Sequence, residues 1–230
     1  MRRELKKLVI TSLLISAILY TLGLFMGLRY GDEIGKIFES RSSRLVAEIK
    51  KVSSELDELR ILSLSNFLSE EDKCRLIESI FEKTKRVKEE YYKILPLRLE
   101  EYELRKNLPR EYLDIKMNYQ ELQLKEWLLV MNLRVCNEKI APILYFFKPE
   151  CSLCVKQGEE MDRIRDFLKE RGFTPLIYTI DINFQSPVLT FLKEKYNVSD
   201  APSFIFINTP FLSFTDSKSF KSYFEKANQE

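Results

Sequence analysis

The chain of 230 residues contains no histidine. This absence excludes catalytic triads that rely on histidine, histidine general bases and histidine metal ligands. Glycine is also scarce, with six residues in total and none between Gly35 and Gly158. Because tight turns between strands favour glycine, so long a stretch without it predicts long helices in this part of the chain.

Neither sign of charge is in excess, since there are 37 Lys and Arg residues and 35 Asp and Glu residues. No segment is basic enough to indicate a nucleic-acid-binding protein, which needs a clustered positive surface. Hydrophobic residues make up 45% of the chain, which is enough for a core, and the length suits one or two domains. We therefore expect no nucleic-acid partner.

The longest apolar run covers residues 8–28, which contain no charged residue. A helix rises about 1.5 Å per residue, so this run would extend over about 31 Å, the thickness of the hydrocarbon core of a bilayer. We predict a cytoplasmic tail and a transmembrane helix over residues 1–29, which form a single-pass anchor in the cell membrane. A cleaved signal peptide is the alternative, but its apolar part is normally shorter.

The charges beside this run predict its orientation. The basic residues before it are Arg2, Arg3, Lys6 and Lys7. Because basic residues stay on the cytoplasmic side of a membrane, we expect a cytoplasmic N-terminus and an extracytoplasmic C-terminal domain.

Four glycines recur at every fourth position, namely Gly23, Gly27, Gly31 and Gly35. On a helix this spacing places them on one face, as in packing motifs of small residues. One interpretation is the seam of a homodimer. The other is that these glycines merely fall near the end of a helix.

Residues 30–139 are predicted to form an all-α, coiled-coil-like region. Between residues 32 and 64 the apolar residues follow a heptad-like track that Ser42 and Ser63 interrupt. The apolar members of this track are Phe38, Leu45, Ile49, Val52, Leu56 and Leu59.

Two more helices are expected after the first one. Ser69, which three acidic residues follow, has the pattern of a helix start. Pro96 ends that helix. A short, charged helical piece is expected over residues 97–108, and a third long helix over about residues 110–137. If these helices are antiparallel neighbours, Cys74 and Cys136 lie at the same end of the hairpin. The two cysteines would then form a structural disulfide, remain buried free thiols, or act as a second redox pair.

Residues 140–230 have a different pattern, in which short apolar runs alternate with amphipathic stretches. This pattern predicts a small α/β domain. The expected strands are 143–147, 175–182, 204–207 and 211–214, and the expected helices follow Cys151, cover 187–196 and begin at about 216.

Cys151 and Cys154 directly follow the first of these strands and open a helix. A zinc site needs four ligands, and without histidine it would also need the other two cysteines, so we expect no metal and no other cofactor. A disulfide over so short a loop would constrain little of the unfolded chain, which disfavours a purely structural role. A redox-active disulfide is the remaining interpretation.

The position of Cys151 at the start of a helix suits this chemistry. The helix dipole and the exposed N–H groups stabilise a thiolate, and the pKa of such a thiol can fall from about 8.5 to roughly 3.5–7.5. Lys148 would add to this effect and Glu150 would oppose it. We therefore predict that Cys151 attacks and that Cys154, one turn into the helix, resolves the mixed disulfide.

The C-x-x-C after a buried strand, together with YNVSDAPSFIFI over residues 196–207, resembles the thioredoxin-like family. The resemblance covers roughly residues 141–230. It implies that the Ala201–Pro202 bond is cis and that Ala201, Pro202 and Ser203 hold the backbone of a substrate. It further implies protein thiols or disulfides as substrates and a membrane redox partner that resets the cysteines.

The chain departs from this family at several positions. Ser152 and Leu153 stand in place of Gly-Pro, Glu150 replaces an aromatic residue, and Tyr145 stands where some members carry a buried acid. Glycines expected near the last strands are missing over residues 208–214. These departures bear on rate and on the direction of electron flow more than on the fold.

The expected fold class is an α/β thioredoxin-like C-terminal domain preceded by an N-terminal transmembrane helix and an all-α region. The leading functional hypothesis is a membrane-anchored extracytoplasmic thiol–disulfide oxidoreductase. The alternative is a non-catalytic, membrane-tethered helical dimer or interaction protein with a thioredoxin-like peptide-binding module.

Overall fold

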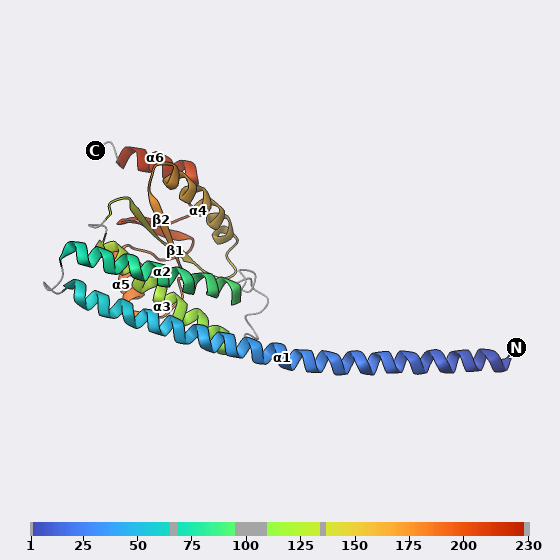
Figure 1. Cartoon of the computed structure of the whole chain (residues 1–230). Coiled ribbons are helices and arrows are strands. Elements are labelled where there is room, and N and C mark those ends of the chain that lie inside the picture. The colour runs from blue at the N-terminus through green and yellow to red at the C-terminus, as the bar shows by residue number, and fades with distance from the viewer. Residues whose placement is uncertain (1, 65–68, 95–109, 134–136, 228–230) are drawn as a thin grey trace. The chain divides into compact units, whose positions relative to one another are not determined.

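A computed structural model of the chain describes residues 2–64, 69–94, 110–133 and 137–227. The chain divides into two compact units, residues 1–44 and 45–230. Figure 1 shows the elements, which follow in the order α1 (Arg2–Leu64), α2 (Glu70–Ile94), α3 (Arg110–Leu133), β1 (Ile140–Phe147), α4 (Ser152–Glu170), β2 (Thr174–Asp181), α5 (Pro187–Lys195), β3 (Ser203–Phe206), β4 (Thr209–Phe211) and α6 (Ser217–Ala227). The division predicted from sequence, into residues 1–29, 30–139 and 140–230, stays a prediction.

The prediction of an N-terminal transmembrane helix is wrong. Within the ranges given above, the structure contains no helix that combines enough length with enough apolar character to cross a bilayer. Residues 8–28 do not form an element of their own but are part of α1, which has 63 residues. The charged residues that were read as flanks of a separate segment belong to the same continuous helix.

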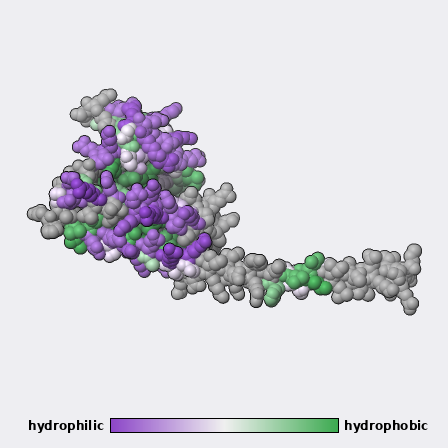
Figure 2. All heavy atoms as spheres, in the orientation of Figure 1, coloured by the Kyte–Doolittle hydropathy of each residue, from purple (hydrophilic) through white to green (hydrophobic). Residues whose placement is uncertain are grey.

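The first unit is described by its part of α1. Apolar side chains between residues 18 and 25 are exposed and form the green band on this helix in Figure 2. An added Cβ on Gly23 would meet no atom within 4 Å. The glycine seam of a homodimer stays a prediction.

The heptad-like track is buried within this chain. Leu45, Ile49, Val52, Leu56 and Leu59 of α1 are all buried in one apolar cluster. The other buried members of that cluster come from α2 and α3 and are Val87, Tyr91, Ile115, Tyr119, Leu122 and Leu129. These five residues therefore pack against two helices of the same chain. Ser42 in the same track is buried as well.

The start of α2 is capped as predicted. Asp72 N donates a hydrogen bond to Ser69 Oγ at 3.1 Å, and the helix begins at the next residue, Glu70. The predicted helical piece over residues 97–108 lies outside the described residues.

The four strands form one sheet in the order β2-β1-β3-β4. β1 is parallel to β2 from Ile140–Thr174 to Phe147–Asp181. β3 is antiparallel to β1, and their ladder ends at the pair Phe146–Ser203. β4 is antiparallel to β3. β1 is central and nearly all its residues are buried, which explains its continuous apolar sequence.

Helices cover both faces of the sheet (Figure 1). One face packs against α4 and α6, in a cluster that includes Ile164, Leu168, Phe220 and Phe224. The other face packs against α5 and also against α3, through Leu124, Trp127 and Val130. Helix α3 is thus part of the core of the α/β domain, an arrangement that the sequence analysis did not predict.

The predicted strands and helices of the α/β domain are confirmed, with one shift. The fourth strand covers residues 209–211 instead of 211–214. β3 turns directly into β4 through Ile207 and Asn208, and Ile207 has a φ of 55°. A β-branched residue in the left-handed region is unusual in such a turn, where glycine is preferred, so the turn had no recognisable sequence signal.

Candidate active site

Cys151 and Cys154 form a disulfide at the carboxyl end of β1, with 5.1 Å between their Cα atoms. β1 ends at Phe147, and the chain turns through Glu150, whose φ of 61° lies in the left-handed region. Cys151 is the N-cap of α4, and its Sγ accepts a hydrogen bond from Cys154 N at 3.0 Å. The strand, turn and helix start therefore place Cys151 as the sequence predicted.

The two cysteines differ in exposure. Cys151 is partly exposed, whereas Cys154 is only 7% exposed and belongs to the core. Leu153 between them is exposed. A partner molecule therefore has access to Cys151 Sγ first, while Cys154 is shielded by its position in the first turn of α4.

The loop before β3 lies beside the disulfide. The Ala201–Pro202 bond is cis, as the resemblance implied, and Ala201 O lies 3.9 Å from Cys151 Sγ. Ala201, Pro202 and Ser203 are all buried, and no partner for the Ser203 hydroxyl is found among the described residues. The structure thus brings five predicted site residues together, and substrate binding by the last three stays a prediction.

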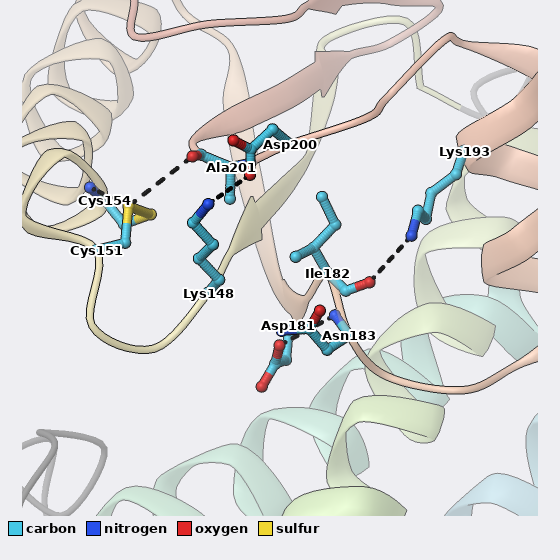
Figure 3. A network of polar contacts seen from close by, with 9 residues as sticks. All are labelled: Lys148, Cys151, Cys154, Asp181, Ile182, Asn183, Lys193, Asp200 and Ala201. Carbon is cyan, nitrogen blue, oxygen red and sulfur yellow. Dashed lines mark hydrogen bonds and ion pairs between the residues drawn. A yellow bond between two sulfur atoms is a disulfide. The ribbon is translucent and has the colours of Figure 1, made fainter.

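An ion pair joins the two loops of the site, as Figure 3 shows. Lys148 Nζ lies 2.6 Å from Asp200 Oδ1, which also accepts a hydrogen bond from Ala201 N at 2.8 Å. The bond from Lys148, and then that from Ala201, lowers the pKa of Asp200. The sequence analysis missed Asp200, because the two residues are 52 positions apart and no motif connects them.

Tyr145 on β1 contacts the first turn of α4. Its hydroxyl group donates a hydrogen bond of 2.8 Å to the carbonyl oxygen of Cys154, and burial raises the pKa of this hydroxyl. A neutral hydroxyl group thus occupies the place where the resemblance led us to look for an acid. It connects the first turn of α4 to the central strand.

The remaining cysteines lie in the helical region. Cys74 of α2 is disulfide-bonded. Cys136, its predicted partner, lies outside the described residues, so the pairing of these two stays a prediction. In the described parts of the chain, no group of three or more potential ligands is arranged to hold a metal ion.

A second polar network lies away from the disulfide, along the outer edge of β2. The Gln123 side chain accepts a hydrogen bond from Thr179 N at 2.9 Å and donates one to Thr179 O at 3.3 Å. Lys88 Nζ donates to Ile177 O at 3.2 Å. We name these contacts the β2-edge network. Because an uncovered edge strand invites pairing with other chains, helices α2 and α3 here protect the sheet.

Comparison with known proteins found no counterpart for this chain: no family model, no curated protein and no solved structure matches it.

Proposed function

We propose that the protein is a thiol–disulfide oxidoreductase that acts on protein thiols or disulfides through Cys151 and Cys154. The observation that carries the proposal is a disulfide whose more exposed sulfur caps a helix N-terminus next to a cis-proline loop. The order of the sheet, β2-β1-β3-β4 with β1 parallel to β2, supports the resemblance to the thioredoxin-like family.

The electrostatics of the site favour a thiolate at Cys151 once the disulfide is reduced. The first N–H groups of α4 point toward its N-terminal end. One of them, Cys154 N, donates both to the carbonyl oxygen of Cys151 and to Cys151 Sγ. A thiolate in this place gains the same bond in a charge-assisted form, which lowers the pKa of the thiol.

The reaction follows from these roles. The Cys151 thiolate attacks one sulfur of a substrate disulfide, and the other substrate sulfur leaves as a thiolate. Cys154 then loses its proton to solvent and attacks Cys151, which releases the second substrate thiolate and forms the Cys151–Cys154 disulfide. Two electrons pass to the substrate. A partner dithiol restores the reduced pair by the reverse steps, and the relative potentials decide the direction.

Two cysteine variants test the proposal. Cys151→Ser is expected to lower the turnover of a small disulfide substrate to the uncatalysed rate, because the attacking sulfur is gone. Cys154→Ser is expected to accumulate a mixed disulfide at Cys151, visible as an adduct by mass spectrometry. Ser213→Ala serves as the control, since Ser213 is exposed and lies outside both α4 and the loop before β3. Unchanged turnover in Cys151→Ser would refute the proposal.

The reduction potential separates this function from the alternative of a non-catalytic module. Structural disulfides have potentials below about −300 mV, whereas redox-active ones lie above this value. We expect the reduction potential of the Cys151–Cys154 pair, measured by equilibration with glutathione or dithiothreitol buffers, to lie above about −300 mV. A potential below this limit would favour the peptide-binding module. The extracytoplasmic location and the membrane redox partner stay predictions.

A further inference from the structure

Lys148 and Asp200 lie just beyond the end of the sheet, where β1 has ended and β3 has not yet begun. The ladder between β1 and β3 ends at Phe146 and Ser203. If its register continued, Lys148 would lie opposite Ala201, but the residue before Ser203 is Pro202, which has no N–H group to donate. Beyond the last ladder pair, the ion pair of Lys148 with Asp200 joins the two chain segments.

The ion pair is linked to both sides of the reactive sulfur. Lys148 begins the loop that leads to Cys151. Asp200 Oδ1 accepts the hydrogen bond of Ala201 N, and the carbonyl oxygen of Ala201 lies 3.9 Å from Cys151 Sγ. In Figure 3 the pair lies between the loop of the disulfide and the loop before β3. Each residue of the pair is therefore connected to Cys151 through one short segment or contact.

The two charges act on Cys151 in opposite senses. A lysine ammonium group near a thiol favours the thiolate, whereas an aspartate opposes it. Because they are 2.6 Å apart, their fields largely cancel at the sulfur. Other charged groups at this end of the sheet are Glu150 on the same loop and Lys156 on α4, both exposed, and the Lys116–Asp181 ion pair at the end of β2.

We propose that Lys148 and Asp200 are positioning residues whose paired charges hold the Cys151 loop against the Ala201 loop and keep the net field of the pair on Cys151 close to zero. The N-terminus of α4 then dominates the ionisation of this thiol. The inference rests on the proposed function, because the group that it controls is the attacking thiol of that reaction.

Two single substitutions test this inference. Each removes the ion pair, and the charge that remains is positive in one variant and negative in the other. Asp200→Asn keeps an oxygen that accepts the Ala201 N–H and leaves the positive charge of Lys148 unpaired. Lys148→Gln leaves the negative charge of Asp200 unpaired. The first is expected to lower the pKa of the Cys151 thiol and the second to raise it, each by about half a unit, as for a unit charge in a largely solvated site.

The measurement is the pH at half-maximal rate of iodoacetamide alkylation of Cys151, in the reduced full chain. The reduction potential of the pair is measured alongside, and it is expected to become more oxidising in Asp200→Asn and more reducing in Lys148→Gln, because a stabilised thiolate stabilises the reduced form. The double variant is expected to return close to the wild-type midpoint, since it carries neither charge.

Glu225→Gln is the matched control, because it breaks an exposed ion pair with Arg171 at the other end of α4. It is expected to leave the midpoint unchanged. Shifts in the same direction in both single variants would overturn the inference, because a purely structural clamp acts alike in both. No shift in either variant would overturn it too. If the wild-type midpoint itself equals that of free cysteine, the proposed function fails, and the direction of the two shifts still decides the inference.

Discussion

The outer edge of β2 and the carboxyl end of β1 belong to the same sheet but differ in how far their polar side chains are exposed to water. Along the β2 edge, Gln123 is buried and both hydrogen bonds of its amide go to the backbone of Thr179. At the end of β1, Lys148 and Asp200 are paired but open to water, with 39% and 68% of their side chains exposed.

Because of this difference, we expect the first region to contribute mainly to stability and the second mainly to reactivity. A buried hydrogen-bonded group is costly to leave without its partner, whereas an exposed ion pair contributes little to stability but acts on nearby charges. We therefore expect substitutions at the β2 edge to change the free energy of unfolding, and substitutions at the end of β1 to change reactivity. Each prediction below tests one side of this contrast.

The largest effect on stability is expected from Trp127→Ala. Trp127 of α3 is 2% exposed and packs with the sheet, so its removal should lower the free energy of unfolding by about 3–5 kcal/mol. Denaturant unfolding measures the change. The control Trp127→Phe keeps most of the apolar volume and removes an indole N–H for which no partner is found in the described parts of the chain. An equal loss in both variants would contradict the packing role.

The next largest effect is expected from Gln123→Ala. This substitution leaves the backbone groups of Thr179 without the amide that pairs them, at a cost of about 1–3 kcal/mol. Hydrogen exchange should show faster exchange of the Thr179 amide while the turnover of a small disulfide substrate is unchanged. Gln123→Glu is a useful comparison, since it keeps an acceptor for Thr179 N. Altered turnover would show that the two regions are coupled.

Contacts between distant parts of the chain could not be predicted from the sequence, whereas local patterns could. The C-x-x-C and most strand positions were predictable, because each depends on a short segment with its own pattern, and the resemblance to the thioredoxin-like family implied the cis-proline. The contact of Gln123 with Thr179 and that of Lys148 with Asp200 join segments more than 50 residues apart, and nothing local indicates them. The apolar run at the start of the chain was predicted as a separate element, and the structure makes it part of a longer helix.

A smaller effect is expected from Tyr145→Phe on the central strand β1. The variant keeps the ring and loses the hydrogen bond to the carbonyl oxygen of Cys154, so the free energy of unfolding should fall by about 1 kcal/mol. Thermal unfolding of the oxidised and the reduced protein measures the loss. If the bond only anchors α4 to β1, the loss should be the same in both states. A loss confined to one state would instead link Tyr145 to the redox change.

The smallest effect is expected in Glu126→Gln, as a change in how the free energy of unfolding depends on pH. Glu126 accepts a hydrogen bond from Thr84 Oγ1 at 3.0 Å, and burial raises the pKa of its carboxyl group despite that bond and the nearby Lys88. The folded state therefore binds a proton more tightly than the unfolded state, and the contribution of Glu126 to stability falls as pH rises above its unfolded pKa.

Glutamine mimics the protonated acid and still accepts the bond from Thr84. The stability of Glu126→Gln relative to wild type is expected to increase as pH rises from about 4.3, the ordinary pKa of a glutamate, toward 8. Urea unfolding at a series of pH values gives this difference. A relative stability that falls over the same range would show that the carboxylate is favoured by folding, contrary to the burial argument.

The ionisation of Cys151 decides between the redox function and an inert disulfide. In the reduced full chain, the rate of alkylation of Cys151 is followed from pH 4 to 10 by mass spectrometry of the labelled peptide. A helix N-terminus that stabilises the thiolate should place the midpoint at or below about 7.5. A midpoint near 8.5, as for an unperturbed cysteine, would contradict the role given to α4 and with it the proposed oxidoreductase.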